Sequence, residues 1–230
     1  MSDPGLDEAL PEERMQSVEA ATGAVREILR PELYRGHPGQ LDEVDAARAQ
    51  EYALLAALLA RPPDAALLNR IAQLRSDASP LGVAHAALAR AADGASAEKI
   101  EREYFDLFIG VGRGELLPYG SYYLTGFLNE RPLARLREDL RALGIERGDR
   151  LNEPEDHAAI LCEIMAGLIR GKFGAAVESQ QQIFERHLAP WIRRFFADLA
   201  AAEAADFYRH VGAIGCLLIE IETQAFALPA

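Results

Sequence analysis

The segment from Asn152 to His157 has the highest density of reactive side chains in the chain, with three carboxylates and a histidine in six residues. Glu153 and His157 are four residues apart, a spacing that allows an ion pair or weak metal chelation on one helix face. Asp156 and His157 are residue types that transfer protons in acid–base catalysis. The segment therefore suggests three hypotheses: a weak metal site, an acid–base pair, or a well-formed helix N-terminus.

The helix hypothesis explains most of this segment. Asn152 is a suitable N-cap, Glu155 follows at capping-box spacing, and Pro154 falls in the first turn, where its missing N–H costs nothing. Negative charge is also favoured at this end of a helix dipole. We therefore predict a helix from Pro154 to Gly171, with His157 on its apolar face.

Catalytic hypotheses find little further support. Adjacent positions on a helix diverge by about 100°, so Asp156 and His157 would not relay a proton to one another. A carboxylate-bridged metal bundle needs Glu-x-x-His pairs, which do not occur. Ser121 lies in no Gly-x-Ser-x-Gly elbow, and Cys162 and Cys216 have no base nearby in the sequence. We expect no catalytic residue, no metal site and no cofactor.

A glycine-rich stretch from Gly110 to Gly120 follows a predicted helix. It lacks both the strand context and the spacing of a phosphate-binding loop, so we expect a flexible or tightly turned loop. Tyrosines beside a glycine-rich backbone are suited to forming a groove for an apolar peptide segment. The aromatic residues grouped around this loop are Tyr104, Phe108, Tyr119, Tyr122, Tyr123 and Phe127.

Composition narrows the class of protein. The 230 residues are 50% hydrophobic, with a mean hydropathy of -0.07, which is typical of a folded domain with a substantial core. The net charge of -12 and the isoelectric point near 4.9 argue against nucleic-acid binding and favour cationic or apolar partners. The acidity is concentrated in residues 1–60, which carry a net charge of -7.

Membrane insertion and secretion are not expected. The longest apolar runs, Tyr52 to Ala60 and Val211 to Ile219, are shorter than the roughly 20 residues that span a bilayer. The first thirty residues are acidic and contain no apolar core of a signal peptide. Two isolated cysteines offer no disulfide framework, so we predict a cytoplasmic protein.

Hydrophobic periodicity predicts helices and no strands. We expect an all-α fold: one compact domain of about eight to ten helices over residues 44–230, preceded by an acidic, disordered tail over residues 1–43. Pro62, Pro63 and Pro190 mark helix breaks, and Asp64 and Ser96 mark caps. The expected helices cover approximately residues 44–60, 65–75, 81–92, 97–109, 129–143, 154–171, 175–188, 191–199 and 206–226.

Five segments of the chain belong together as a set of motifs. They are Tyr104–Gly110 (YFDLFIG), Pro118–Leu124 (PYGSYYL), Asn152–His157 (NEPEDH), His187–Trp191 (HLAPW) and Phe207–Arg209 (FYR). In this order and spacing they resemble the TorD/DmsD family of molybdoenzyme chaperones, also called redox enzyme maturation proteins. The resemblance covers roughly residues 44–221, and the N-terminal tail has no counterpart in it.

The resemblance implies a cytoplasmic chaperone without catalytic activity. It would bind the twin-arginine signal peptide or the apo catalytic subunit of a molybdopterin-dependent oxidoreductase, assist cofactor insertion and delay export. It would act as a monomer or weak homo-oligomer. Transferred to this sequence, the peptide-binding residues are Tyr104, Leu107, Phe108, Tyr119, Gly120, Ser121, Pro154, Asp156 and His157.

An acidic rim would complement the two guanidinium groups of such a peptide. We expect this rim to consist of Glu153, Glu155 and Asp156, with Glu115 as a further candidate. Two alternatives remain. One is an assembly factor of the nitrate-reductase type, which acts on a catalytic subunit that is not exported. The other, ranked lower, is a metal-dependent or acid–base enzyme that uses Glu153, Asp156 and His157.

Overall fold

The computed structural model describes residues 41–146, 153–174 and 178–228. Within these residues the chain forms ten α-helices, two π-helical turns and no strand, which confirms the predicted all-α class. None of the described helices is long and apolar enough to span a membrane. The elements are α2 (Glu43–Ala60), α3 (Ala65–Ile71), α4 (Pro80–Ala92), α5 (Ala97–Tyr104), η2 (Phe105–Ile109), α6 (Gly120–Thr125), α7 (Arg131–Ala142), α8 (Ala158–Ile169), α9 (Glu178–Ile183), η3 (Phe184–Leu188), α10 (Ile192–Ala201) and α11 (Tyr208–Phe226).

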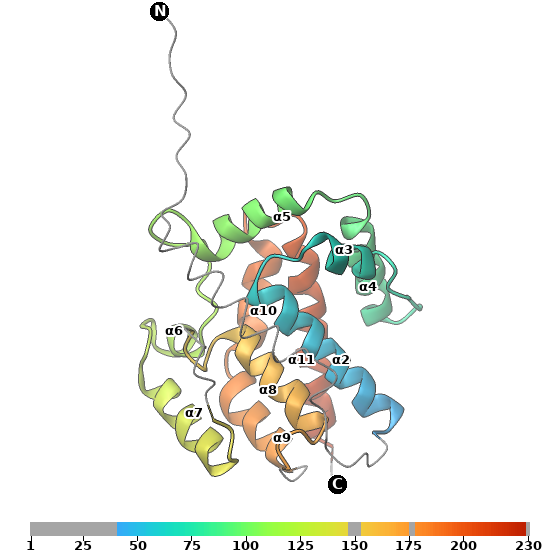
Figure 1. Cartoon of the computed structure of the whole chain (residues 1–230). Coiled ribbons are helices and arrows are strands. Elements are labelled where there is room, and N and C mark those ends of the chain that lie inside the picture. Colours follow the sequence, from blue (N-terminus) through green and yellow to red (C-terminus); the bar gives the residue numbers. More distant parts are fainter. Residues whose placement is uncertain (1–40, 147–152, 175–177, 229–230) are drawn as a thin grey trace, which may run out of the picture.

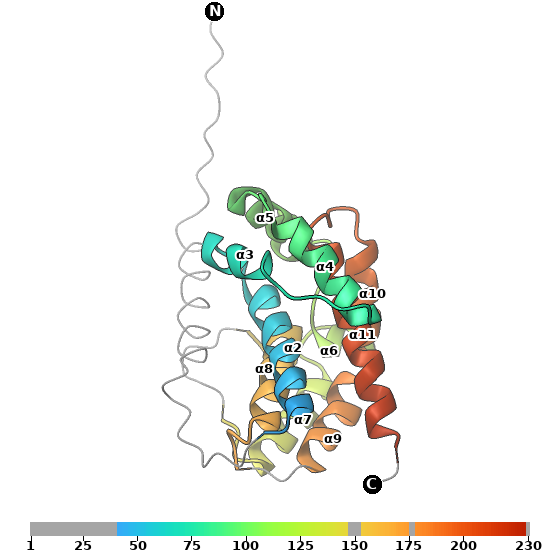
Figure 2. The same cartoon turned by 90° about the vertical axis from the view of Figure 1, so that its right-hand side faces the viewer.

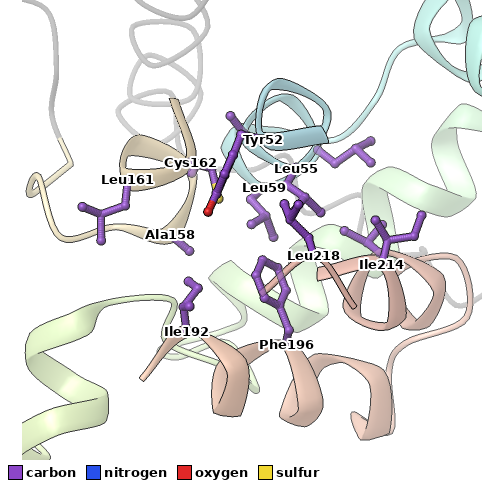
Figure 3. Close-up of a cluster of buried hydrophobic side chains, with 14 of the residues drawn as sticks. Tyr52, Leu55, Leu59, Ala158, Leu161, Cys162, Ile192, Phe196, Ile214 and Leu218 are labelled. Atoms are coloured by element: carbon purple, nitrogen blue, oxygen red, sulfur yellow. The ribbon is translucent and has the colours of Figure 1, made fainter. Parts of the chain in front are cut away.

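Four long helices surround the core. α2 packs along α8, α10 packs along α11, and the two pairs form facing layers (Figures 1 and 2). α4 crosses α11 at one end of the molecule, and α6 and α7 form one side of it. Figure 3 shows side chains from all four core helices meeting between the layers, among them Tyr52, Leu55, Cys162, Phe196 and Leu218.

The sequence of α8 explains its central place. All but two of its twelve residues are buried, and a helix that is apolar on every side is stable only when it is surrounded by others. On α11, glycine allows close approach to α10. A Cβ at Gly215 would lie 2.3 Å from the Phe196 ring, and one at Gly212 would lie 2.6 Å from the Ala200 nitrogen. The layers therefore interlock through small residues.

Local signals place many helix ends where the sequence predicts them. Asp64 and Ser96 are N-caps, accepting hydrogen bonds from backbone N–H groups at 2.8 and 3.3 Å. α2 ends immediately before Pro62, and α10 begins only after Pro190. α2 itself begins at Glu43, inside the stretch predicted as a tail, and the rest of that tail up to residue 40 lies outside the described residues.

Some boundaries differ from the predictions. α3 ends at Ile71 instead of Arg75, and α11 begins at Tyr208 instead of Asp206. The helix capped by Ser96 continues to Ile109, but its last five residues form the π-helical turn η2. The helix predicted over residues 175–188 likewise ends in the π-helical turn η3.

The start of α8 was predicted wrongly. The helix begins at Ala158, not at Pro154, and His157 is its N-cap. The three residues before His157 form a turn, closed by a 3.0 Å hydrogen bond from the His157 N–H to the Pro154 carbonyl. Asn152, the predicted N-cap, lies outside the described residues. The acidic side chains of this turn contact other parts of the chain, as described below.

Candidate functional site

Two segments far apart in the sequence meet in a short antiparallel contact, which we call the junction (residues 118–121 and 153–158). Tyr119 and His157 pair as an isolated bridge. The Gly120 N–H donates to the Asp156 carbonyl at 2.9 Å, and the Ala158 N–H donates to the Pro118 carbonyl at 2.8 Å. The junction therefore brings together six of the predicted site residues: Tyr119, Gly120, Ser121, Pro154, Asp156 and His157.

Two side chains of the junction cap helices. The Asp156 carboxylate, with 3% of the residue exposed, accepts a 2.7 Å hydrogen bond from the Ser121 N–H in the first turn of α6. The His157 Nδ1 accepts a 3.1 Å hydrogen bond from the Ala159 N–H in the first turn of α8. These adjacent residues therefore hold the starts of two different helices.

His157 is kept neutral. Burial lowers the pKa of the His157 imidazole, although the nearby charges of Glu153 and Asp156 oppose this effect. A neutral ring can accept a hydrogen bond at Nδ1, as observed. The edge-on contact with the Tyr119 ring, at a centroid distance of 5.1 Å, completes its surroundings. The ring acts as a structural cap in this arrangement.

Tyr119 and Glu153 form the more accessible part of the junction. Both are half-buried, and the Tyr119 hydroxyl donates to Glu153 Oε2 at 2.5 Å. Burial and then the Glu153 charge raise the pKa of Tyr119 well above its ordinary value, so this hydroxyl remains a donor. The same two causes raise the pKa of Tyr104, which shows that Tyr104 lies within electrostatic range of Glu153.

Two buried polar atoms of the junction have no hydrogen-bond partner among the described residues. They are Ser121 Oγ and Asp156 Oδ1. Buried polar groups are nearly always paired, so an unpaired atom of this kind often marks the place of a water molecule or a ligand. The two belong to residues already joined by the hydrogen bond from the Ser121 N–H to the Asp156 carboxylate.

Trp191 supports the junction from inside. Its indole N–H donates to the His187 carbonyl at 2.7 Å, and the ring lies against Gly120. A Cβ at Gly120 would lie 3.0 Å from Trp191 Nε1, so glycine allows this approach. Trp191 belongs to a motif that carries the family resemblance, but we did not predict a role for it in the site.

The other predicted residues, on α5 and η2, lie mainly inside the fold. The Tyr104 hydroxyl donates to the Leu59 carbonyl at 3.1 Å, and Leu107 is fully buried. Phe108 is half-buried and packs edge-on against Tyr208 at a centroid distance of 5.6 Å. Leu107 can therefore support a binding surface, whereas only Phe108 of these three is partly open to contact.

The glycine-rich loop is tightly turned. The N–H groups of Glu115 and Leu116 donate to carbonyls in η2 at 3.1 and 2.8 Å. The Glu115 carboxylate accepts hydrogen bonds from the N–H groups of Glu203 and Ala204, at 2.8 and 3.1 Å, in the connection before α11. Glu115 therefore fixes a loop instead of contributing to an acidic rim.

The rest of the predicted rim is also engaged. Glu155 forms an ion pair with Arg137 at 2.8 Å, and Asp156 caps α6. Glu153 is the member that faces an accessible aromatic ring. Nothing in the local sequence identifies Arg137 as a partner, because it lies 18 residues away on α7.

A family model described as nitrate reductase delta subunit matches residues 74–197. The chain belongs to this family. Relatives in it include proteins named chaperone protein TorD: one from Vibrio cholerae is 29% identical over 131 residues, which are 53% of this chain and 60% of that protein. Another from Aliivibrio fischeri is 27% identical over 139 residues, covering 56% of this chain and 65% of that protein. The match thus spans less than two thirds of the length of these relatives.

A solved structure supports the fold. A proposed redox enzyme maturation protein from Archaeoglobus fulgidus aligns with a TM-score of 0.52 at 19% identity, covering 83% of this chain and 99% of that chain. Together with the family model, this match confirms the predicted resemblance and the helical fold. The relatives are named as chaperones, in agreement with the prediction of a chaperone and not an enzyme.

Proposed function

We propose that this chain is a cytoplasmic maturation chaperone for a molybdopterin-dependent oxidoreductase. It binds the twin-arginine signal peptide of the apo enzyme, or its apo catalytic subunit, assists cofactor insertion and delays export. The observation that carries the proposal is the junction, where the accessible Tyr119–Glu153 pair lies beside two buried polar atoms that have no partner among the described residues. Membership in a family whose relatives are named TorD chaperones supports it.

The accessible chemistry of the junction suits a peptide that carries arginine. A guanidinium group can form charged hydrogen bonds to the Glu153 carboxylate and stack on the Tyr119 ring. The apolar part of the peptide would contact the half-buried Phe108 and Pro154. Leu107 and Asp156 are buried, so they would support this surface from inside and would not contact the peptide.

Calorimetric titration with a twin-arginine signal peptide tests the proposal. Glu153→Gln should weaken binding by about tenfold or more, because a hydrogen bond to a charged group contributes about 1.5–3 kcal/mol. A peptide with lysines in place of both arginines should also bind more weakly to the unmodified chain, because an ammonium group keeps the charge but cannot stack on Tyr119 or form a bidentate contact with Glu153. Glu101→Gln, at an exposed position on α5, is the matched control.

The buried residues need a parallel stability measurement. Asp156→Ala and His157→Ala remove helix caps, so weaker binding by these variants supports a role in the site only if their melting temperatures show that they are folded. Unchanged peptide affinity in Glu153→Gln, together with unchanged affinity in a folded Asp156→Ala variant, would remove the junction from the binding site.

The second candidate is an assembly factor that acts on a catalytic subunit that is not exported. It is favoured by the description of the matching family model as nitrate reductase delta subunit. The two functions differ in the ligand they require. Binding to a catalytic subunit from which the export signal has been deleted, without binding to the isolated signal peptide, would favour the assembly factor.

The enzyme alternative receives little support from the geometry. Glu153, Asp156 and His157 each contact a different partner: a tyrosine hydroxyl, the N–H of Ser121 and the N–H of Ala159. Within the described residues, no three His, Cys, Asp or Glu side chains gather as a metal-binding group. We therefore assign these three residues to the junction. Metal analysis of the purified protein would reopen the alternative if it detected a stoichiometric ion.

A further inference from the structure

The end of α6 and the connection that follows it expose three large apolar side chains within five residues. The exposed fractions are 43% for Leu124, 69% for Phe127 and 44% for Leu128. We call these three residues the α6–α7 patch. It lies on the side of the molecule formed by α6 and α7, away from α3 and α4 (Figure 1). Apolar side chains that are exposed as a group, and not singly, mark a surface suited to contact with a partner.

The backbone presents this patch in a fixed conformation. Gly126 and Asn129 have positive φ angles of 84° and 60°, and such a value is uncommon for a residue other than glycine. The Thr125 hydroxyl donates to the Ser121 carbonyl at 2.8 Å and accepts from the Phe127 N–H at 3.2 Å. Phe127 is therefore held outward by a hydrogen-bonded turn.

Arginines lie on both sides of α6. Arg113 donates to the Tyr122 hydroxyl at 2.8 Å, with its guanidinium 5.3 Å from the centre of that ring. Arg194 lies 5.8 Å from the Tyr123 ring, and its nearest carboxylate is Asp198, at 4.0 Å. Each guanidinium is stacked on a ring and remains exposed. Stacked arginines are already ordered, which lowers the entropy cost of a new contact.

The start of α7 adds positive potential. Arg131 and Arg135 are exposed and form no ion pair with any described residue, while Glu130 and Glu138 are the exposed acids of this segment. The first turn of α7 contains no acidic residue and receives no side-chain cap. The N-cap residue is Glu130, but its carboxylate makes no cap hydrogen bond, so the first N–H groups of α7 still present the positive end of the dipole beside Arg131. Four exposed arginines thus lie on α7 or against α6, in a chain whose net charge is -12.

We propose that residues 1–13 of this chain bind the α6–α7 patch. This stretch contains five acidic residues and no basic one, and Leu6, Ala9 and Leu10 follow the i, i+3, i+4 spacing of one helical face. It therefore combines apolar side chains that can cover the patch with carboxylates that can pair with the surrounding arginines. Charge complementarity of this kind selects one surface among several.

The intervening chain is long enough for this contact. The sequence places 27 residues between residue 13 and residue 41, and a flexible chain of that length would have a root-mean-square span of about 30 Å. A domain of this size has a radius of gyration of about 16 Å, so such a tether would reach any part of its surface. Tethering also supplies an effective concentration in the millimolar range, so a weak contact suffices.

Hydrogen exchange tests the proposal on the full chain and on a chain that begins at Arg14. Amides of residues 126–130 should exchange at least threefold more slowly in the full chain, and high salt should reduce the difference. A synthetic peptide of residues 1–13 should restore protection to the shortened chain. Phe127→Ser in the full chain should abolish it, whereas Val83→Ser, at a position 57% exposed on α4, should not.

Three results would overturn the proposal. The first is equal exchange in the full and shortened chains, with no effect of the peptide at millimolar concentration. The second is protection that persists in the shortened chain and grows with protein concentration, which would assign the patch to a second copy of the chain. The third is peptide binding that Val83→Ser weakens as much as Phe127→Ser does. Because Leu124, Phe127 and Leu128 are exposed, serine at any of them should leave the melting temperature unchanged.

Discussion

Glu103 provides the sharpest test of how α5 is held against the start of α11. Its carboxylate, with 7% of the residue exposed, accepts hydrogen bonds from three successive N–H groups at the start of α11. The distances are 2.8 Å from Asp206, 3.1 Å from Phe207 and 2.7 Å from Tyr208. Glu103→Ala would leave all three donors without this partner. A hydrogen bond to a charged group contributes about 1.5–3 kcal/mol, and relaxation of the loop recovers part of the sum, so we expect a loss of about 3–5 kcal/mol.

Urea denaturation and calorimetry measure this effect. For a chain of this length each kcal/mol lowers the melting temperature by about 2–4 °C, so Glu103→Ala should melt roughly 10 °C lower. Glu103→Gln, which retains an acceptor oxygen but no charge, should fall between the alanine variant and the unmodified chain. Glu101→Ala, exposed on the same helix, should change stability by less than about 0.5 kcal/mol. A loss below about 1 kcal/mol in Glu103→Ala would show that water satisfies the α11 donors equally well.

Two further predictions concern α8 and the junction. Burial raises the pKa of Glu163 to about 7, above the ordinary 4.5, so ionisation opposes folding progressively as pH rises from 4.5 to 7 and fully above it. The free energy of unfolding of Glu163→Gln should therefore exceed that of the unmodified chain by about 2 kcal/mol at pH 8 and equal it near pH 4. Urea denaturation at several pH values measures this difference. The same pH dependence for both proteins would refute the prediction. Gly120→Ala should lower the melting temperature by a few degrees, because overpacking against Trp191 costs about 1–3 kcal/mol and helix propensity returns at most about 1 kcal/mol. Trp191→Phe should reduce that loss, and a raised melting temperature in Gly120→Ala alone would mean that the indole moves aside.

Much of the helical fold could be predicted from the sequence because helix ends depend on neighbouring residues. Asp64 caps α3 and the break at Pro190 separates η3 from α10, as expected from residue type alone. The start of α8 could not be predicted in this way. Glu155 stands at capping-box spacing, but its carboxylate forms an ion pair with Arg137, which lies on a different helix, α7. The capping-box pattern is present in the sequence, but tertiary packing gives the Glu155 carboxylate another partner.

The candidate site was predicted in part. The motifs containing Tyr119 and His157 were expected to share a surface, and the structure joins them directly. Leu107, which the resemblance assigns to the peptide-binding surface, is fully buried. It follows Ile100 and Tyr104 at the i, i+4, i+7 spacing of one helical face, and all three are buried.

Within the motifs that carry the family resemblance, the residues that fix the fold differ from those suited to choosing a client. Asp156, His157 and Trp191 use their side chains to join α6 to α8 and to support Gly120. A side chain that caps a buried helix start cannot be replaced freely without moving that helix, so these positions fix the shape of the junction. Under the proposed function, selectivity for a peptide would arise mainly from side chains at the surface of the junction, and Tyr119 and Glu153 are the two of this kind in direct contact. Exchanging the surface pair should therefore change which peptide binds with little change in stability, whereas exchanging the capping residues should change stability first.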